Sequence, residues 1–379
     1  MRLPFSLVSA LLVARGFAGS VFAASGPLQG MPPIVNPQDI YSELTPNKFN
    51  PVIKNYPHLI YVPNSKSNTV DVIDQKTLKI INHFPVGKEP QHVTPSWDLK
   101  SLWVLSDLGD SLRRIDPATG KEQETIHVED PYNMYYTPDG KYAIVVAERK
   151  ERLDFHDPNN MTKVIERLPV PGCKGIDHMD FSADGRYLIA SCEFAGRVVK
   201  VDVAERKVIG LLDLAPHGMP QDVKTSPDGK VFYVADMMSN GIWLVDGDAF
   251  KKIGFIETGI GAHGLYPSRD SKYLYISNRG HQPNERRLPG EGSISVLDFA
   301  TRKVVKKWPI PGKSSPDMGN VSADGKVFWV SGRYDKEIYG IDLTDGHLVA
   351  RIPVGLGPHG LCVYPIPGRY SLGHTGNMR

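Results

Sequence analysis

Cysteine is scarce in this sequence, which contains only Cys173, Cys192 and Cys362 among its 379 residues. None of them belongs to a C-x-x-C-H motif, so covalent attachment of a c-type haem is excluded. In an exported protein one disulfide is allowed, and Cys173 with Cys192 is the only pair within a single unit of the repeat described below. The alternative is that all three cysteines are small buried thiols.

Helical periodicity, the common catalytic and nucleotide-binding motifs and a large net charge are also missing from the sequence. No segment shows helical periodicity over 10–12 residues, which argues against an α/β fold. The sequence has no G-x-S-x-G elbow, phosphate loop or dinucleotide fingerprint, so catalytic-triad and nucleotide chemistry have no support. The formal net charge is only +2 and the pI is about 8.2, which does not favour a nucleic-acid partner.

The first residues predict export. Arg2 precedes a mostly apolar segment, 3–23, which ends in the small-residue cleavage pattern Val21-Phe22-Ala23. Arg15 interrupts this segment, and no other stretch is long enough to span a bilayer. We therefore expect a signal peptide over residues 1–23, a periplasmic or secreted protein, and no membrane span. Residues 24–57 are rich in Pro and Asn and predict an extended arm.

A repeat of about 44 residues runs through the rest of the chain. Its landmark is a turn between two strand-like runs, clearest as TPDGKYAIVV at 137–146, SADGRYLIAS at 182–191, SPDGKVFYVA at 226–235 and SADGKVFWVS at 322–331. Three degraded copies bring the total to seven. Each unit contains four short runs rich in Val, Ile and aromatic residues, separated by Gly, Asp, Asn or Pro. The pattern predicts an all-β, seven-bladed β-propeller with four antiparallel strands in each blade.

The two incomplete units predict how the ring closes. Residues 59–86 supply three strands but no innermost one, whereas residues 359–364 supply an innermost strand with little after it. We expect the C-terminal strand to pair with the N-terminal strands, which removes the open sheet edges. The propeller is therefore predicted over residues 58–366. Residues 367–379 are left as a tail.

Three segments of the repeat region are LIYVPNSKSNTVDVID at 59–74, VFYVADMMSNGIWLVD at 231–246 and ARIPVGLGPHGLCVYP at 350–365. They resemble the YVTN-type, YncE-like family of exported seven-bladed propellers. The resemblance implies the fold but not an activity, since such propellers include binding proteins, surface-layer components and enzymes. It also extends to haem-d1 propellers. Those usually have eight blades and a cytochrome portion, both of which this chain lacks.

One column of the repeat carries polar residues at the start of each innermost strand. It recurs every 41–54 residues, and the longest interval contains an inserted loop at 280–292. Because innermost strands surround the central channel, equivalent positions are expected to converge on the axis. The column consists of His92, Asn133, His178, Asp222, His263, Asp317 and His359.

This composition suits a metal site, because neutral imidazole binds Cu, Zn or Fe and carboxylates broaden the range. We expect His92, His178, His263 and His359 to be ligands of a transition metal, with Cu favoured over Zn, Fe or Ca. Asp222, Asp317 and Glu193 are the candidate catalytic carboxylates. The residues expected to bind substrate are Asn133, Glu148, Asp236, Arg279 and Arg333. The methionines that follow column positions, Met134, Met179 and Met318, are expected to fill the core, because strand alternation points them away from the axis.

Two functions follow from this site. One is a metal-dependent periplasmic enzyme that acts on a small polar or anionic substrate and is expected to be a monomer. The loop at 280–292 would then be a lid over the site; it carries His281, Glu285, Arg286 and Arg287. The other is a non-catalytic propeller in which the same residues hold the blades together and the rim binds a peptide, a cofactor or a periplasmic partner protein.

Overall fold

A computed structural model describes residues 26–282 and 290–379. The predicted signal peptide and the insertion residues Glu285, Arg286 and Arg287 lie outside this part of the chain. The helical segments of the described ranges are two short 3-10 turns, η1 (Glu148–Lys150) and η2 (Glu193–Ala195). Neither has the length of a membrane-spanning helix.

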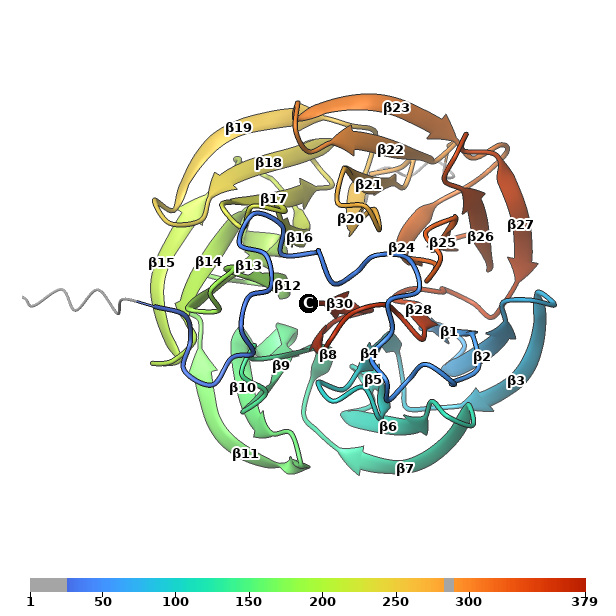
Figure 1. Ribbon diagram of the computed structural model, residues 1–379, viewed down its shortest axis with the longest axis horizontal. Helices are drawn as coiled ribbons and strands as arrows, with labels where there is room; N and C mark the ends of the chain where they lie inside the picture. The colour runs from blue at the N-terminus through green and yellow to red at the C-terminus, as the bar shows by residue number, and fades with distance from the viewer. Residues whose placement is uncertain (1–25, 283–289) are drawn as a thin grey trace, which may run out of the picture.

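Seven sheets are arranged in a ring around a central axis (Figure 1), and the predicted seven-bladed propeller is confirmed. Five blades have four consecutive strands, which run from the axis outwards in this order: β4 (Pro90–Pro95), β5 (Leu102–Ser106), β6 (Ser111–Asp116), β7 (Lys121–His127); β12 (Ile176–Phe181), β13 (Tyr187–Cys192), β14 (Arg197–Asp202), β15 (Lys207–Asp213); β16 (Pro220–Thr225), β17 (Val231–Asp236), β18 (Gly241–Asp246), β19 (Lys251–Glu257); β20 (Ala262–Pro267), β21 (Tyr273–Asn278), β22 (Ser293–Asp298), β23 (Lys303–Pro309); and β24 (Pro316–Val321), β25 (Val327–Gly332), β26 (Glu337–Asp342), β27 (Leu348–Pro353).

A sixth blade contains the residues that close the ring. Its outer strands are β1 (Leu59–Asn64), β2 (Thr69–Asp74) and β3 (Lys79–Pro85), and its innermost strand is β28 (Cys362–Tyr364). The register pairs Leu59 with Tyr364 and Tyr61 with Cys362 in antiparallel fashion. The predicted closure by the C-terminal innermost strand is therefore confirmed.

The seventh blade carries the tail. It consists of β8 (Pro131–Tyr136), β9 (Ala143–Ala147), β10 (Arg152–Asp157) and β11 (Asn160–Pro169), and it is extended at the axis by β29 (Ser371–Gly373) and β30 (Asn377–Met378). Gly373 pairs with Tyr135 on β8, and Arg379 forms a 2.9 Å ion pair with Asp180 on β12. The chain thus ends near the centre of the ring (Figure 1). No pattern in the sequence predicted this buried segment.

The repeated Asp-Gly turns join each innermost strand to the second strand. Gly140, Gly185, Gly229 and Gly325 all have φ between 69° and 75°, a left-handed conformation that only glycine adopts without strain. The preceding aspartates accept hydrogen bonds within the turn, as in the 2.7 Å bond from Ser182 Oγ to Asp184 Oδ1. These local requirements explain why the turn was the strongest repeat signal.

The arm before the propeller crosses the face that carries these turns, shown in blue in Figure 1. Ile40 N donates to Pro227 O at 2.8 Å, and Asn47 N donates to Ala323 O at 2.9 Å. Tyr41 is buried, and its hydroxyl donates to Thr225 O at 2.6 Å. Arm and tail share one apolar cluster that contains Ile40, Leu44, Ile366 and Met378. Together they cover one end of the central channel.

Two of the three cysteines form a disulfide, and the third is a free thiol. Cys173 and Cys192 are bonded, with their Cα atoms 4.7 Å apart, and Cys362 is buried as a free thiol. The disulfide links the loop before β12 to the end of β13 within one blade.

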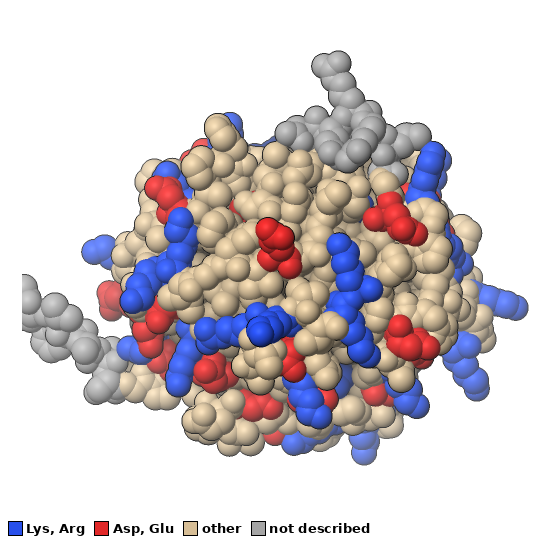
Figure 2. All heavy atoms as spheres, turned by 90° about the horizontal axis from the view of Figure 1, so that it is seen from above, with Lys and Arg blue, Asp and Glu red and all other residues tan. Residues whose placement is uncertain are grey.

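The outer wall of the ring is solvent-exposed and carries charges of both signs. Figure 2 shows Lys and Arg side chains interspersed with Asp and Glu on the side view. The outermost strands alternate, as in β15, where every second residue is exposed. On the side that Figure 2 shows, charges of both signs alternate and form no patch of a single sign.

We predict that the tail contributes to the stability of the core. Leu372 is 1% exposed in the cluster formed with β8, β12 and β13, so Leu372→Ala should lower the free energy of unfolding by about 2–5 kcal/mol. Leu211→Ala is the matched control, because Leu211 is 42% exposed on β15 and its substitution should cost less than about 0.5 kcal/mol. Urea titration measures both. Equal values for the two variants would show that the tail is not packed in solution.

Candidate axial site

A break in strand register places the column residues at the axis. In six of the innermost strands the pairing with the second strand shifts by a bulge or irregularity at the column position, as between Ile176 and Met179 or between Pro316 and Gly319. A bulge turns a side chain away from strict alternation. As a result, consecutive residues both reach the axis: Asp177 Oδ1 lies 3.0 Å from Nε2 of His178.

All seven column residues are at most 1% exposed. The rings of His92 and His359 are 4.8 Å apart between centroids, and the ring of His263 is 5.9 Å from His359 and 6.3 Å from His178. Residues from different blades therefore meet at one place, and they form two groups.

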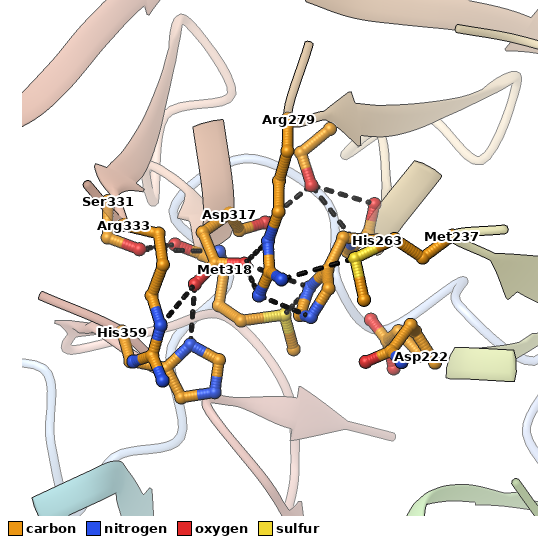
Figure 3. Close-up of polar contacts among 12 residues, drawn as sticks. Asp222, Met237, His263, Arg279, Asp317, Met318, Ser331, Arg333 and His359 are labelled. Atoms are coloured by element: carbon orange, nitrogen blue, oxygen red, sulfur yellow. Dashed lines mark hydrogen bonds and ion pairs between the residues drawn. The ribbon is translucent and has the colours of Figure 1, made fainter. Parts of the chain in front are cut away.

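The first group, which we name the Asp317 network, contains His263, Arg279, Asp317, Met318, Arg333 and His359 (Figure 3). Asp317 Oδ1 accepts a 2.7 Å hydrogen bond from Arg279 Nε, and Oδ2 lies 2.6 Å from His359 Nδ1. Arg333 Nε is 3.9 Å from Oδ2. The carboxylate thus links β24 to residues from both neighbouring blades.

Both ring nitrogens of His263 have partners in this network. Arg279 donates to His263 Nε2 at 2.8 Å, while Nδ1 lies 3.1 Å from both Asp317 Oδ1 and Met318 Sδ. A guanidinium on Nε2 uses the lone pair that a metal would need. The expectation that Met318 only fills the core is wrong, because the bulge in β24 turns its sulfur toward His263.

The network contains one carboxylate and two guanidinium groups, and the arginines hold the carboxylate in its ionised form. Burial alone would raise the pKa of Asp317, but Arg279, His263 and Arg333 outweigh burial and lower it, so the carboxylate stays ionised. Burial and the two arginines lower the pKa of His359 well below its usual value, so that imidazole is neutral. The network behaves as an internal salt bridge, and its arginines are largely occupied.

The second group, which we name the axial cluster, contains His92, His178 and His374. One nitrogen from each ring lies within 4.8 Å of the others. His374 belongs to the tail, and its backbone N donates to Met134 O at 2.8 Å. It has no place in the repeat register, so the column could not identify it. The only sequence signal was an isolated histidine in an otherwise unexplained segment.

The axial cluster contains buried ring nitrogens without hydrogen-bond partners. Neither nitrogen of His92 has one, nor does Nε2 of His178 or of His374. Such unpaired polar atoms are costly in a protein interior. Gly360 leaves the space for His92, because a Cβ at that position would lie 2.0 Å from His92 Nδ1.

Asn133 joins two members of the axial cluster. Its Nδ2 lies 3.0 Å from Nδ1 of His178 and 3.0 Å from Nδ1 of His374, while its Oδ1 accepts from the backbone N of Met134 at 2.8 Å. In this structure Asn133 therefore orients two imidazoles, and its expected role in substrate binding stays a prediction.

The remaining predicted residues occupy different positions. Asp222 accepts hydrogen bonds from the backbone N atoms of Val223 and Leu265, which joins two blades, and burial raises its pKa to about 6. Asp236 accepts from the backbone N of Ser239 in its own loop, from the backbone N of Met219 before β16, and from the indole of Trp243 on β18 at 3.0 Å, so it fixes that turn. These two carboxylates fit the expected structural role of holding blades and loops.

Glu148 and Glu193 lie on the rim at equivalent places in neighbouring blades, each as the first residue of a 3-10 turn. Burial and then Glu193 raise the pKa of Glu148 to about 9. Arg333 is only partly exposed, and its Nη1 donates to Ser65 Oγ at 3.2 Å. These side chains follow the second strands of their blades, β9, β13 and β25, on the face opposite the arm.

A family model described as YNCE-like beta-propeller matches residues 50–367. The chain belongs to this family. The expected resemblance to YncE-like propellers is thus confirmed over the whole ring.

Individual relatives are more distant. The β subunit of hydrazine synthase from Kuenenia stuttgartiensis is 28% identical over 231 residues, which are 47% of this chain and 59% of that subunit. A Kuenenia stuttgartiensis hydrazine synthase structure superposes with a TM-score of 0.59 at 18% identity, covering 71% of this chain and 87% of that one.

Two other solved structures share the architecture. The dihydro-haem d1 dehydrogenase NirN has a TM-score of 0.59 at 15% identity, with 80% of this chain and 74% of that one covered. A putative 6-phosphogluconolactonase from Bacteroides uniformis has a TM-score of 0.65 at 17% identity, with 80% and 99% covered. At these identities the likeness shows the fold alone.

We predict that acid destabilises the metal-free protein through its buried imidazoles. Burial lowers the pKa of His178 to about 3, whereas an unfolded histidine has a pKa of about 6.5, so the unfolded state binds the proton first as the pH falls. The contribution of a neutral buried imidazole to the free energy of unfolding is complete above pH 6.5 and decreases as the pH falls below that value. For His178 alone this decrease amounts to about 2 kcal/mol between pH 7.5 and pH 5.

Urea unfolding in a chelator at the two pH values checks this prediction. The free energy of unfolding at pH 7.5 minus that at pH 5 should be about 2 kcal/mol smaller in His178→Gln than in the wild type, whatever the absolute stability of the variant. His127→Gln on β7 is the control, because His127 is exposed and its replacement should leave the difference unchanged. An unaltered pH dependence in His178→Gln would contradict a neutral buried imidazole.

Proposed function

We propose that this protein is an exported enzyme whose axial cluster binds one transition-metal ion through His92, His178 and His374. The observation that carries the proposal is the set of buried imidazole nitrogens from two blades and the tail that face one another without hydrogen-bond partners. Three nitrogen donors suit copper or zinc, and they do not suit calcium, which prefers oxygen.

The Asn133 side chain contacts two of the proposed ligands, His178 and His374. In the metal-free arrangement the Asn133 amide donates to Nδ1 of His178 and His374, so their hydrogens lie on Nε2. A metal held through Nε2 would require those hydrogens on Nδ1, and the Asn133 amide would have to rotate and present its oxygen to them. That rotation gives up the bond from the Met134 backbone N. Asn133 therefore sets the tautomer of two ligands.

A metal held by three imidazoles supplies a Lewis acid with an open position and, if it is copper, an electron acceptor. The surrounding residues have separate tasks. The ionised Asp317 keeps Arg279 and Arg333 beside the site, and His359, with Nε2 3.5 Å from the Tyr132 hydroxyl, is placed to exchange a proton with it. Glu193 on the rim is the candidate general acid or base.

Two features support export to the periplasm or beyond. The sequence begins with a segment that fits a signal peptide, and the structure holds a buried Cys173–Cys192 disulfide, which persists in oxidising compartments.

A second function is favoured by one comparison. The relative in Kuenenia stuttgartiensis is a subunit of hydrazine synthase, so this propeller can also be proposed as a component of a larger periplasmic assembly. Asp222 and Asp236 support this alternative, because their hydrogen bonds stabilise the scaffold and need no ligand. In that case the axial histidines serve packing alone.

We predict about one tightly bound copper or zinc per chain in tag-free protein purified from the periplasm. His92→Ala and His374→Ala should each reduce the bound metal at least tenfold, because each removes one of three ligands. His263→Ala is the informative comparison, since His263 is bonded to Arg279 and its loss should leave most of the metal bound. Elemental analysis gives the stoichiometry. Metal-free wild-type protein that also fails to bind added copper or zinc would leave only the scaffold function.

A second prediction tests the position of His92 without removing a ligand. In Gly360→Ala the new methyl group collides with His92 Nδ1, so metal affinity should fall about tenfold or more while the propeller stays folded. Gly254→Ala on β19 is the matched control, because its nearest neighbours lie 3.9 Å from the added carbon. Competition with a chromogenic chelator measures affinity, and circular dichroism measures folding. Equal affinities for the two variants would place His92 outside the metal site.

A further inference from the structure

A cavity of about 650 Å³ lies at the junction between the blade of β4–β7 and the blade of β8–β11 (Figure 1). Strands β5, β6 and β7 contribute to one wall, and residues 158–162, which end β10 and begin β11, contribute to the other. We call it the junction cavity. None of the described residues that line it belongs to the Asp317 network or to the axial cluster. Its volume lies within the range of sites that bind small molecules.

A shortened turn widens this junction. Residues 158–159 alone join the third and fourth strands of their blade, whereas the equivalent turns of the other six blades contain four or five residues. Elsewhere the longer turn covers the preceding blade, as where the ring of Phe299 lies 5.5 Å from the ring of Tyr233. Trp103 holds the place of Tyr233 in the repeat, and the hollow beside Trp103 is larger than the hollow of about 520 Å³ beside Tyr233.

The walls of the junction cavity are partly aromatic, with Trp97, Trp103 and Tyr136 among the lining residues. Trp97 stands at a position where the four clear copies of the repeat have Pro or Ala. Gly140 leaves room for the indole, because a Cβ at that position would lie 2.8 Å from two of its ring atoms. Aromatic side chains give a rigid apolar surface that loses little entropy when a ligand packs on it.

The charged side chains of the lining cancel one another. They are two cations, Lys100 and Arg114, and two carboxylates, Asp98 and Glu124. Arg114 donates to Glu124 at 3.0 Å. A wall with equal numbers of positive and negative groups has no net field that would attract a charged ligand. The lining therefore favours a ligand that is polar but neutral.

Two buried nitrogen atoms of the lining residues have no hydrogen-bond partner, Trp97 Nε1 and Arg114 Nε. Both carry an N–H group, so each needs an acceptor oxygen. An unpaired buried donor costs stability, and a ligand that supplies the oxygen recovers it. Ser101 and Asn159 also line the cavity, and their side chains can both donate and accept.

From these features we propose that the junction cavity binds a neutral saccharide. The C–H faces of a sugar ring pack on aromatic side chains, and its hydroxyl groups both donate and accept hydrogen bonds, as this lining requires. A neutral polyol satisfies the unpaired N–H groups without adding a charge to a balanced wall. The site is separate from the proposed metal centre, so the inference goes beyond the proposed function and does not depend on it.

Maltotriose, cellotriose and chitotriose are the probes, each titrated calorimetrically into full-length mature protein, with triglycine as the peptide comparison. Wild-type protein should bind at least one of the three saccharides saturably and should not bind triglycine. Trp97→Phe keeps an aromatic ring and removes the N–H group, so it should weaken saccharide binding about threefold to tenfold.

A second variant tests the cavity without changing a buried residue. Thr162 is exposed on β11 and lines the cavity, so Thr162→Trp should fill part of the space and weaken binding about tenfold or more. Thr344→Trp is the matched control, because Thr344 is exposed in the turn between β26 and β27, and it should bind as the wild type does. The proposal is overturned if the wild type binds none of the saccharides, if triglycine binds in their place, or if the two tryptophan variants bind equally well.

Discussion

The structure depends on three backbone pairs between β1 and β28, which convert a row of sheets into a ring. Without this closure the innermost strands would have no common axis, and residues from different blades would not meet. Closure also removes two sheet edges that would otherwise be open to association. The tail adds to it by pairing with β8 inside the ring, so the centre is filled by the chain itself.

Charge at the axis is divided between two sides. Asp317 contacts two arginines and two imidazoles on one side, and the arginines keep it ionised there. The imidazoles of the axial cluster are kept neutral by burial, as for His92, whose pKa falls well below its usual value. On the rim, burial raises the pKa of Glu148 to about 9, so this carboxyl is protonated near neutral pH. One ring of column positions thus contains a neutral cluster of imidazoles beside a network with a carboxylate and two guanidinium groups, a division that the residue types alone do not show.

The sequence predicted the fold because its signals are local and repeated. Asp-Gly turns need positive φ, and short runs of Val, Ile and aromatics favour strands, so seven units identify a seven-bladed ring. The column of polar residues was also visible, since register alone brings it to the axis. What could not be predicted depends on irregularity: His374 follows no repeat, and the bulges that turn Asp177 and Met318 are features of backbone geometry. The specific partner of each side chain, such as Arg279 on Asp317 of the next blade, depends on packing between blades.

The closing pair has a consequence for biosynthesis. Leu59 and its partner Tyr364 stand at opposite ends of the propeller sequence, with the other six blades between them. A chain that emerges gradually from a ribosome or a translocation pore presents the exposed edge of β1 long before β28 is made. Contacts so distant in sequence form slowly. Until they form, the unfinished sheet is open to other chains, so a cell that makes this protein would benefit from a chaperone that shields the first blade.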